Sequence, residues 1–362
     1  MDITIYGTGT SGTELIKSVL DTFLNQAGID FNMKEVNDVN EFMEKKIQSV
    51  PAVMVDDSEL YVLKQNGKFT ESLRNLIQSI LKKKDYGTMN KIIVPTDFSD
   101  TSMNAFSFAN RYAKDVSGMI KVVHVYYPSS ADINGNVFVD VGLKNVKQAL
   151  LDDFVKSVNQ DWIGEVMSTS LIDKTFAEGF PVPSIVEVAE KNNASCIIIG
   201  TTGEGETFKK IFGSVSTELV KKSTVPVIVV PPEAVYKGFK KILYASQDAD
   251  LDKRCMDRLC SFSQIHEAEL HIVHVAKSDV DSSNFSGSEI ESYCDQVEIK
   301  VSLVVNDDVE EGLHQYADDK NIDLIVLSSK RRSFIENIFH SSVSKRMAMH
   351  THIPIMVLHD NG

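Results

Sequence analysis

The sequence predicts an α/β protein in which two parallel sheets follow a smaller N-terminal part. From residue 91 onward, short apolar runs alternate with segments that carry apolar residues at helical spacing. The runs are apolar at nearly every position, which is typical of strands buried on both faces of a parallel sheet. The pattern also occurs twice. We therefore expect three parts, called here the first, middle and last parts: residues 1–85, 90–232 and 238–362.

The composition argues against several classes of partner. Asp and Glu number 51 against 37 Lys and Arg, and the net charge of −14 disfavours nucleic acid or an anionic membrane surface. The N-terminus lacks the basic start of a signal peptide, and no apolar run approaches the roughly 18 residues of a membrane span. The four cysteines show neither a CxxC pair nor metal-ligand spacing, so we expect reduced thiols in a cytoplasmic protein without a metal site.

The first part contains strand-like and helical segments in the order strand, helix, strand, helix, strand, strand, helix. Its strands are expected at residues 3–6, 31–36, 50–55 and 61–63. The last helix is predicted to begin at Thr70 as its cap, with these apolar residues at helical spacing: Leu73, Leu76, Ile77, Ile80 and Leu81.

This order resembles a thioredoxin or glutaredoxin fold, and two short motifs carry the resemblance. Residues 7–13, Gly-Thr-Gly-Thr-Ser-Gly-Thr, look like the family's GTGCxxC active loop with threonine at both cysteine positions. The Val50-Pro51 pair looks like the family's cis-proline segment, so a cis bond is expected. Because thiol–disulfide exchange requires a thiolate, the resemblance implies a redox-inactive domain. It would serve as scaffold or protein contact, or carry some unrecognised chemistry.

Strands and helices alternate through the middle part. Strands are expected at residues 91–94, 122–125, 166–172, 196–199 and 227–230, and helices at about 105–116, 144–159, 185–189 and 214–222. Ligands of such sheets bind beyond the carboxyl ends of the strands. Three residues follow or end strands at that edge: Asp97, Val125 and Gly200.

A glycine-rich loop follows the strand at residues 196–199. Two residues separate Gly200 from Gly203, and nine more lead to Gly213 and Ser214 at the predicted start of a helix. Glycine lets the backbone turn sharply and approach a ligand closely, and the N–H groups of a helix start attract anions. Taken alone, the pattern fits either a phosphate site or two ordinary tight turns.

Three separated motifs together resemble the universal stress protein family, adenine-nucleotide-binding type. Residues 95–99 match the family's opening motif, the G-x2-G-x9-G-(S/T) spacing matches its loop, and residues 225–230 match its closing strand. The resemblance implies a site for ATP or AMP, with or without Mg²⁺ at the phosphates. The residues implied are Pro95, Thr96, Asp97, Val125, Gly200, Gly203, Gly213, Ser214, Val215 and Ser216.

The resemblance also implies a role for each of these residues. The backbone of Val125 would bind the adenine edge, and Asp97 would form a hydrogen bond near the adenosine. Gly200 and Gly203 would let the backbone pass close to the ribose and phosphates. The helix start, residues 213–216, would hold the phosphates through the amides of residues 213 and 215 and the serine side chains.

Simpler interpretations exist for some of these residues. Asp97 could help to cap the following helix, and Ser214 could be a plain N-cap, which uses the same geometry as phosphate binding. His124 points to the other side of the strand from Val125, so we expect a packed histidine rather than a base. No Walker P-loop, dinucleotide fingerprint, carboxylate pair or Ser/His/Asp set occurs, so no catalytic residues are predicted.

The last part repeats the middle part. Residues 241–243 follow residues 91–93 by 150 positions, and the Val-His-Val run recurs at the same offset. The closing strand, however, recurs only 128 positions later, at residues 353–357, so the second copy lacks 22 residues between its second and fourth strands.

The site positions differ in the second copy. At these offsets Asp97, Gly200, Gly203 and Gly213 become Gln247, Ser328, Arg331 and Ser341, whereas Ser342 retains the serine of Ser214. We therefore expect no nucleotide there, and a basic loop at residues 330–332 that is either solvated or binds an anion. Family members commonly pair through their last strands. Residues 227–230 and 355–358 are thus the expected interface, in a homo-oligomer or an intramolecular pseudo-dimer.

The sequence as a whole predicts a stress-response protein that binds ATP or AMP in its middle part without appreciable catalysis. It would signal nucleotide state through its conformation or through an unidentified protein partner. Two alternatives remain open at this stage. The chain could be a non-catalytic interaction scaffold that works through the first part, or it could be a weak ATPase.

Overall fold

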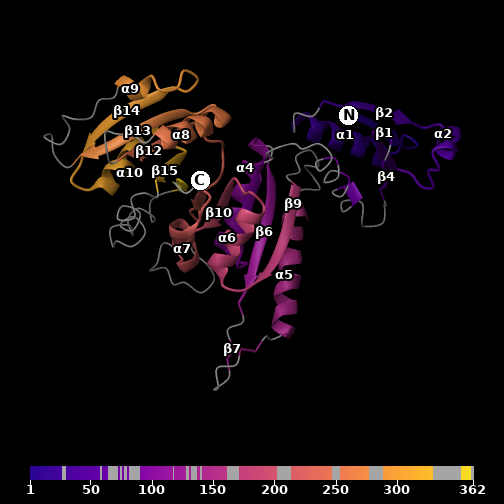
Figure 1. Cartoon of the computed structure of the whole chain (residues 1–362), viewed down its shortest axis with the longest axis horizontal. Coiled ribbons are helices and arrows are strands. Elements are labelled where there is room, and N and C mark those ends of the chain that lie inside the picture. Colours follow the sequence, from indigo (N-terminus) through magenta and orange to yellow (C-terminus); the bar gives the residue numbers. More distant parts are fainter. Residues whose placement is uncertain are drawn as a thin grey trace. The chain divides into compact units, whose positions relative to one another are not determined.

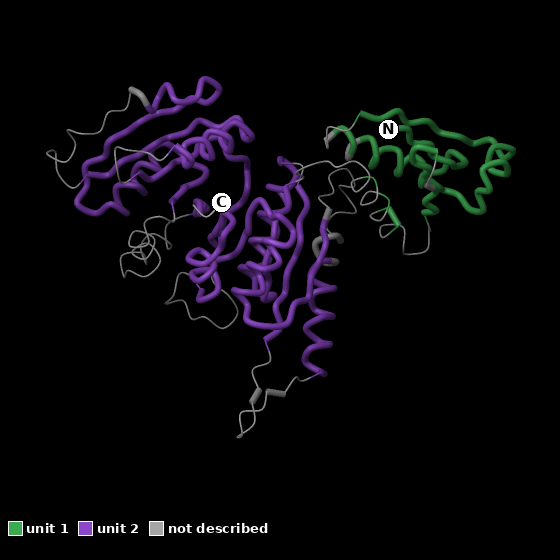
Figure 2. Tube along the Cα trace, viewed as in Figure 1, with its two compact units in different colours: residues 1–89, 159–171 green, residues 90–158, 172–362 purple. Residues whose placement is uncertain are grey.

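The chain forms two compact units in the computed structural model (Figures 1 and 2). Unit 1 holds residues 1–89 and 159–171, and unit 2 holds residues 90–158 and 172–362. No helix among the described residues has the length and apolar content needed to cross a membrane. The structure describes all residues except 27–29, 58, 64–71, 74–75, 77–79, 81–89, 117, 128–129, 132–136, 139–140, 161–170, 202–212, 247–252, 277–287, 329–351 and 360–362.

Unit 1 is built on a mixed sheet with the strand order β2-β1-β3-β4. Strands β1 (Asp2–Tyr6) and β2 (Asn32–Val36) are parallel, whereas β3 (Ala52–Val55) and β4 (Glu59–Val62) are antiparallel to their neighbours. Helix α1 (Ser11–Gln26) buries Ile16, Leu20 and Leu24, and α2 (Val39–Glu44) buries Phe42. The predicted cis Val50-Pro51 bond is confirmed.

The last helix predicted for the first part is described only in places. Ser72, Leu73, Leu76 and Ile80 are helical, and the three apolar side chains among them are buried. The predicted cap, Thr70, and the lysines at 82–84 lie outside the described residues.

Threonine hydroxyls occupy the positions that a thioredoxin-like dithiol would take. The Oγ1 atoms of Thr10 and Thr13 are 3.4 Å apart at the start of α1, and Thr13 is buried. A hydroxyl cannot replace the thiolate that exchanges disulfides. The described active loop therefore contains no redox-active pair.

Unit 2 contains one ten-stranded sheet of order β14-β13-β12-β15-β16-β11-β10-β5-β6-β9. The middle part contributes β5 (Lys91–Pro95), α4 (Asp100–Asp115), β6 (Met119–Tyr126), β7 (Ser130–Ala131), β8 (Val137–Phe138), α5 (Val141–Gln160), β9 (Leu171–Glu178), α6 (Pro181–Lys191), β10 (Cys196–Gly200), α7 (Ser214–Lys222) and β11 (Val227–Val230). Strands β5, β6, β10 and β11 are parallel, as predicted.

The third strand of the middle part lies later in the chain than the sequence suggested. A strand was predicted at residues 166–172, but β9 spans residues 171–178, and residues 161–170 are not described. Strand β9 is an edge strand, and its polar side chains form ion pairs: Asp173 with Lys121 and Lys174 with Asp152. A half-polar edge strand lacks the continuous apolar run on which the prediction depended.

The last part reproduces the five strands that the middle part contributes to the ten-stranded sheet. It holds β12 (Lys241–Ser246), α8 (Lys253–His266), β13 (Glu269–Ala276), α9 (Ser288–Glu291), β14 (Ile299–Val305), α10 (Val309–Lys320), β15 (Leu324–Ser328) and β16 (Ile355–Leu358). Strands β12 and β13 begin 150 positions after β5 and β6, whereas β15 and β16 begin 128 positions after β10 and β11. The shortening lies between the second and third strands of the repeat, where the four-residue α9 stands in place of the 20-residue α5.

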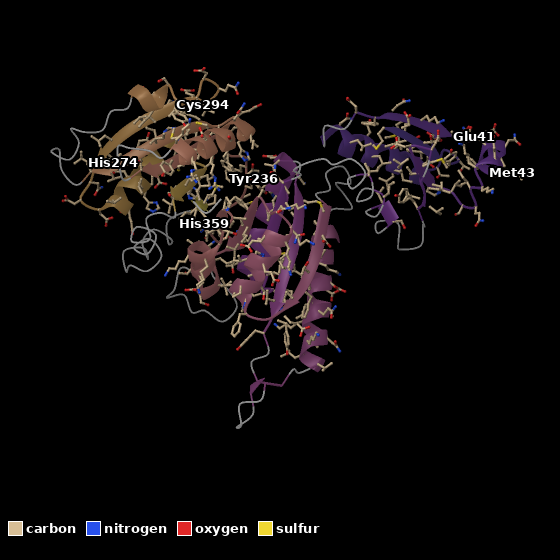
Figure 3. The ribbon with its side chains drawn as sticks, in the orientation of Figure 1. Glu41, Met43, Tyr236, His274, Cys294 and His359 are labelled. Atoms are coloured by element: carbon tan, nitrogen blue, oxygen red, sulfur yellow. The ribbon has the colours of Figure 1, made fainter. Side chains whose placement is uncertain are left out.

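The two halves of unit 2 meet at their closing strands. Strand β11 pairs antiparallel with β16, Ile228 opposite Met356, which confirms the predicted interface within one chain. One apolar core runs along this face of the sheet beneath α6, α7 and α10. Beside it, His359 Nε2 lies 2.7 Å from Val220 O of α7, and Arg258 Nη1 donates to His359 O at 2.6 Å (His359 is labelled in Figure 3).

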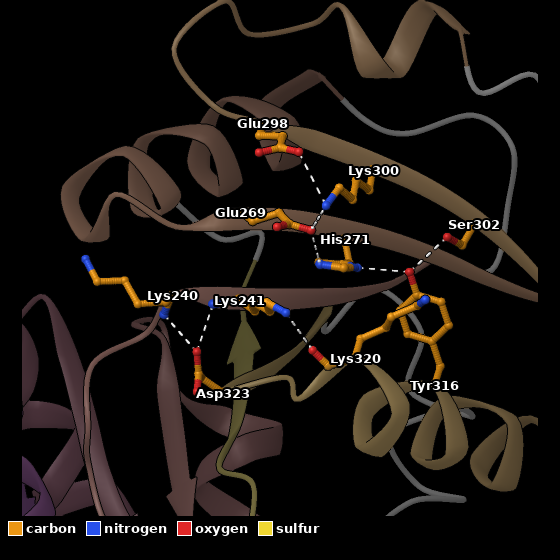
Figure 4. A network of polar contacts seen from close by, with 10 residues as sticks. All are labelled: Lys240, Lys241, Glu269, His271, Glu298, Lys300, Ser302, Tyr316, Lys320 and Asp323. Atoms are coloured by element: carbon orange, nitrogen blue, oxygen red, sulfur yellow. Dashed lines mark hydrogen bonds and ion pairs between the residues drawn. The ribbon is translucent and has the colours of Figure 1, made fainter.

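A polar network ties together β13, β14 and α10 (Figure 4). Glu269 Oε1 lies 2.6 Å from His271 Nε2 and 2.5 Å from Lys300 Nζ. On its other side, His271 Nδ1 lies 2.9 Å from the Tyr316 hydroxyl, which lies 2.9 Å from Ser302 Oγ. Because the carboxylate accepts from Nε2–H, neutral His271 accepts from Tyr316 at Nδ1.

Candidate functional site

A cavity of about 220 Å³ opens at the carboxyl ends of the middle part's strands. Every predicted site residue lines it except Gly203, which lies outside the described residues. The full lining is Pro95, Thr96, Asp97, Ser102, Val123, His124, Val125, Pro181, Ile185, Ile199, Gly200, Gly213, Ser214, Val215 and Ser216. Sequence reasoning missed Pro181 and Ile185, although the Phe-Pro-Val-Pro start of α6 marked that helix end.

The end of β5 forms one side of the cavity and is held by local hydrogen bonds. Asp97 Oδ1 accepts from Ser99 N at 3.1 Å and from Ser99 Oγ at 2.6 Å. Ser99 is the N-cap of α4 and accepts from Ser102 N. Asp97 therefore supports the cap residue instead of capping the helix itself. This contact fixes its carboxylate at the edge of the cavity.

Phe98 makes the turn that follows β5. Its φ of 72° lies in the left-handed region, which non-glycine residues seldom adopt. Its ring packs against His124 with centroids 4.4 Å apart. His124 Nδ1 lies 2.8 Å from Thr96 O, and burial lowers the pKa of this imidazole. The prediction of a packed histidine is confirmed, and His274 repeats the contact with Ser246 O at 3.1 Å.

The backbone groups at the end of β6 extend past the end of the neighbouring strand β5. Thr96 N donates to Val123 O at 2.9 Å, so the backbone groups of Val123 point towards β5. Groups two residues further along a strand point the same way. The pairing of β5 with β6 ends at Pro95 and Val123, and the N–H and C=O of Val125 thus point into the space after β5.

The close backbone approach that requires Gly200 is to the protein itself. A Cβ atom placed on Gly200 would lie 2.7 Å from Thr101 O and 3.0 Å from Thr101 C. Distances this short to backbone atoms cannot be relieved by a side-chain rotation. The absence of a side chain at Gly200 therefore lets β10 lie against the first turn of α4, in addition to lining the cavity.

Helix α7 begins at the cavity, but one of its predicted donors is already used. Gly213 N donates to Thr201 O at 2.5 Å, so this amide, which we expected to bind phosphate, is engaged by the protein backbone in this structure. Ser216 Oγ also donates to backbone oxygens, at 2.9 Å to Thr201 O and 3.0 Å to Gly213 O. These bonds join the two ends of the glycine loop and orient the helix start.

The other polar groups at the start of α7 are the Ser214 hydroxyl and the amides of residues 214 and 215. Ser214 is exposed and Val215 is half-buried at the first two helical positions. The first N–H groups of a helix have no acceptor within that helix, and the helix dipole adds positive potential. The Ser214 hydroxyl and the amides of residues 214 and 215 therefore offer hydrogen-bond donors and positive potential at one end of the cavity, and the other wall, Pro181, Ile185 and Ile199, is apolar.

The described residues form no metal centre at this place. No cluster of three or more His, Cys, Asp or Glu side chains suited to a metal occurs in the described parts of the chain. Asp97 is the one carboxylate among the lining residues, and it is already bound to Ser99. In the last part, the counterparts Gln247, Arg331, Ser341 and Ser342 lie outside the described residues, whereas Ser328 ends β15 as Gly200 ends β10.

Comparison with known proteins identifies the families that the parts of this chain resemble. The sequence model of the universal stress protein family matches residues 88–231 and 291–359, and a thioredoxin domain model matches residues 1–89. A universal stress protein of Methanocaldococcus jannaschii is 29% identical over 164 residues, which cover 43% of this chain and 89% of that protein. One from Synechocystis is 22% identical over 289 residues, which cover 74% of this chain and 99% of the other.

Solved structures agree on the fold. The crystal structure of a universal stress protein from Archaeoglobus fulgidus aligns with a TM-score of 0.58 at 23% identity. The alignment covers 76% of this chain and 98% of that one. At this identity the likeness is one of fold alone.

Proposed function

The chain belongs to the universal stress protein family, and we propose that its middle part binds one adenine nucleotide, ATP or AMP. Family membership supports a stress-response role. One observation carries the nucleotide proposal: a single cavity joins the anion-binding start of α7 to the outward-facing backbone of Val125 and to Asp97. These three features suit the phosphates, the base edge and the ribose of one nucleotide.

The proposed arrangement follows from what each group can offer. The N–H and C=O of Val125 would pair with the adenine edge, which presents a donor beside an acceptor. Asp97 would accept from a ribose hydroxyl. The Ser214 hydroxyl and the amides of residues 214 and 215 would bind phosphate oxygens. Ser216 and Gly213 would act indirectly, since their hydrogen bonds hold the loop ends at Thr201.

We propose that this site does not turn nucleotide over appreciably. Phosphoryl transfer needs a positioned water and neutralised charge, and Asp97, the carboxylate of the lining, is engaged by Ser99. The protein would then report nucleotide state through conformation. An assay of phosphate release that shows turnover abolished by Ser214→Ala would instead favour a weak ATPase.

Calorimetry with ATP, ADP and AMP on the full chain tests the proposal, with Ser214→Glu as the key variant. A carboxylate at the first turn of α7 suits the helix dipole, so folding is retained. It repels phosphate by about 4 kcal/mol per charge at 4 Å, which predicts at least a hundredfold loss of affinity. Wild-type protein that binds none of the three nucleotides would refute the proposal. Repeating the titration with EDTA decides whether Mg²⁺ accompanies the phosphates.

A second candidate function rests on unit 1. Two apolar side chains one helical turn apart on α2 are exposed, Val39 at 64% and Met43 at 75% (Met43 is labelled in Figure 3). They suit a contact with another protein, the scaffold role. A partner that is lost on Met43→Glu but kept on Ser214→Glu would favour this function over nucleotide signalling.

A further inference from the structure

Two cysteines of the last part, 34 positions apart in the sequence, lie near each other. Cys260 lies on α8, and Cys294 lies in the segment between α9 and β14 (Figure 3 labels Cys294). Hydrogen bonds of neighbouring residues bring their side chains together. Both are free thiols in the structure. They belong neither to the nucleotide cavity nor to the first part's inactive loop.

Neighbouring side chains hold this segment against α8 on both sides of the thiol pair. Asp257, Cys260 and Gln264 follow one another at i, i+3 and i+7 and so share one face of the helix. The Tyr293 hydroxyl donates to Asp257 Oδ1 at 2.8 Å, and Gln264 Nε2 donates to Gln296 Oε1. Cys260 and Cys294 thus lie between two hydrogen-bonded pairs that hold residues 293–296 along this face of α8.

The two thiols differ in accessibility. Cys260 is 6% exposed, and burial, with the neighbouring Cys294 and Asp257, raises its pKa to about 12. Cys294 is only partly buried, so it is the member that a solute reaches. Cys255 is also buried on α8 but lies five positions before Cys260, about 140° around the helix from it.

We propose that Cys260 and Cys294 form an oxidation site at which a hydroperoxide, such as hydrogen peroxide, produces an intrachain disulfide. The proposal is independent of nucleotide binding in the middle part. It assigns redox chemistry to the last part of a chain whose thioredoxin-like loop has lost both cysteines.

The reaction proceeds in two balanced steps. The Cys294 thiolate attacks one peroxide oxygen, the O–O bond breaks, and Cys294 becomes a sulfenic acid while the released hydroxide takes a proton to form water. The Cys260 sulfur then attacks the sulfenic sulfur, an S–S bond forms, and the S–O bond breaks. The proton of the Cys260 thiol leaves with the departing hydroxide as water. Two thiols lose two electrons in total, and the peroxide is reduced to two waters.

The disulfide would crosslink α8 to the segment that leads into the edge strand β14. The S–S separation would shorten to about 2 Å, and the crosslink would close a loop from residue 260 to residue 294. A loop closed in this way restricts the unfolded chain and stabilises the folded last part. Thiol reductants would reverse the bond.

Peroxide treatment of the reduced full chain, followed by alkylation and non-reducing peptide mapping, tests the proposal. We expect a linked peptide pair that contains Cys260 and Cys294, and the loss of two hydrogens from the intact mass. The linkage should form at least about tenfold faster in the folded chain than in urea, because folding brings the two sulfurs together.

Three variants serve as controls. Cys294→Ser and Cys260→Ser should each abolish the linkage, whereas Cys255→Ser, on the same helix, should leave its rate unchanged. Melting curves of the reduced variants verify that each has folded. Oxidation of Cys294 to a sulfinic acid without crosslinking would overturn the proposal. So would linkage to Cys255, linkage between two chains, or a linkage that forms only in urea.

Discussion

Gly200 illustrates how one residue type can serve the fold and the site together. Its sequence context pointed to a ligand, and it does line the cavity. Yet the space that a side chain would need is taken by the backbone of Thr101. A glycine in a ligand-binding loop can therefore be needed for packing, and its mutation alone does not report on binding.

We predict that Gly200→Ala destabilises the protein before it affects any ligand. A Cβ atom 2.7 Å from Thr101 O forces β10 and α4 apart, which is expected to cost about 1–3 kcal/mol, as overpacking does. Thermal unfolding without nucleotide would show a lower melting temperature. Ser214→Ala is the matched control at the same site and should melt close to wild type. An unchanged melting temperature for Gly200→Ala would contradict the steric argument.

His266 is a buried imidazole in an aromatic cluster between α4, α8 and the connection after β11. Its ring lies 4.7 Å from that of Phe262, 5.3 Å from Phe239 and 5.6 Å from Tyr112. Burial lowers its pKa to about 4, with Asp115 opposing and Lys240 reinforcing the shift. Nε2 has no hydrogen-bond partner among the described residues.

The lowered pKa of His266 predicts that the folded protein loses stability in mild acid. The unfolded chain takes up the proton near the ordinary pKa of 6.5, whereas the folded chain resists until about pH 4. Stability is therefore retained above pH 6.5 and falls by up to about 3 kcal/mol as the pH drops to 4. Urea unfolding across this range measures the slope, and His266→Phe should flatten it. A slope that is unchanged in His266→Phe would contradict the assignment to this residue.

At the scale of elements, the sequence predicted the positions of apolar and repeated strands better than those of polar strands and single loop contacts. Strands β10 and β11 are continuous apolar runs, and the repeat offsets located β12, β13 and β16 without further signal. The edge strand β9 was misplaced because polar side chains that form surface ion pairs interrupt its apolar pattern. Backbone details such as Gly213 N donating to Thr201 O depend on loop closure, which no residue pattern encodes.

Most of the candidate site was predictable from the positions of the strand ends. Its predicted members follow strands whose ends meet at one edge of a parallel sheet, and that rule brought Asp97, Val125 and Gly200 together. The apolar wall from α6 was missed. Pro181 and Ile185 fit an ordinary amphipathic helix, and only tertiary packing turns them towards the cavity.

The polar network of the last part is predicted to stabilise β13, β14 and α10 as a group. Tyr316→Phe removes the hydroxyl between His271 and Ser302 and leaves one buried and one half-buried polar group unpaired, at an expected cost of about 1–3 kcal/mol. Tyr293→Phe is the control: the Tyr293 hydroxyl donates to the Asp257 carboxylate, but this pair is exposed, so little change is expected. Equal effects of the two substitutions in urea unfolding would count against a buried network.

At the scale of the whole molecule, unit 2 is a pseudo-dimer within one chain. The antiparallel pairing of β11 with β16 and the shared apolar core make each half cover the other's closing strand. The last part, which lacks the site glycines, therefore still stabilises the fold by covering β11. Through His359 it also contacts α7, the helix whose start faces the cavity.

We predict that residues 90–232 expressed alone form a homodimer. Without the last part, β11 becomes an exposed edge of buried, apolar residues, which readily pairs with another strand. Sedimentation equilibrium would show twice the chain mass, and Ile228→Lys should weaken the dimer because it places a charge in the new contact. A stable monomer would show that β11 does not need the cover that β16 provides.

The central claim is that one chain holds one competent nucleotide site, in the middle part. Its most direct test is the stoichiometry of ATP or AMP binding to the full chain by calorimetry. It is measured for wild type, Ser214→Glu and Ser342→Glu, the equivalent serine of the last part. The account predicts one nucleotide per chain for wild type and Ser342→Glu, and none for Ser214→Glu. Two nucleotides per wild-type chain, or binding that is lost in Ser342→Glu and kept in Ser214→Glu, would contradict it.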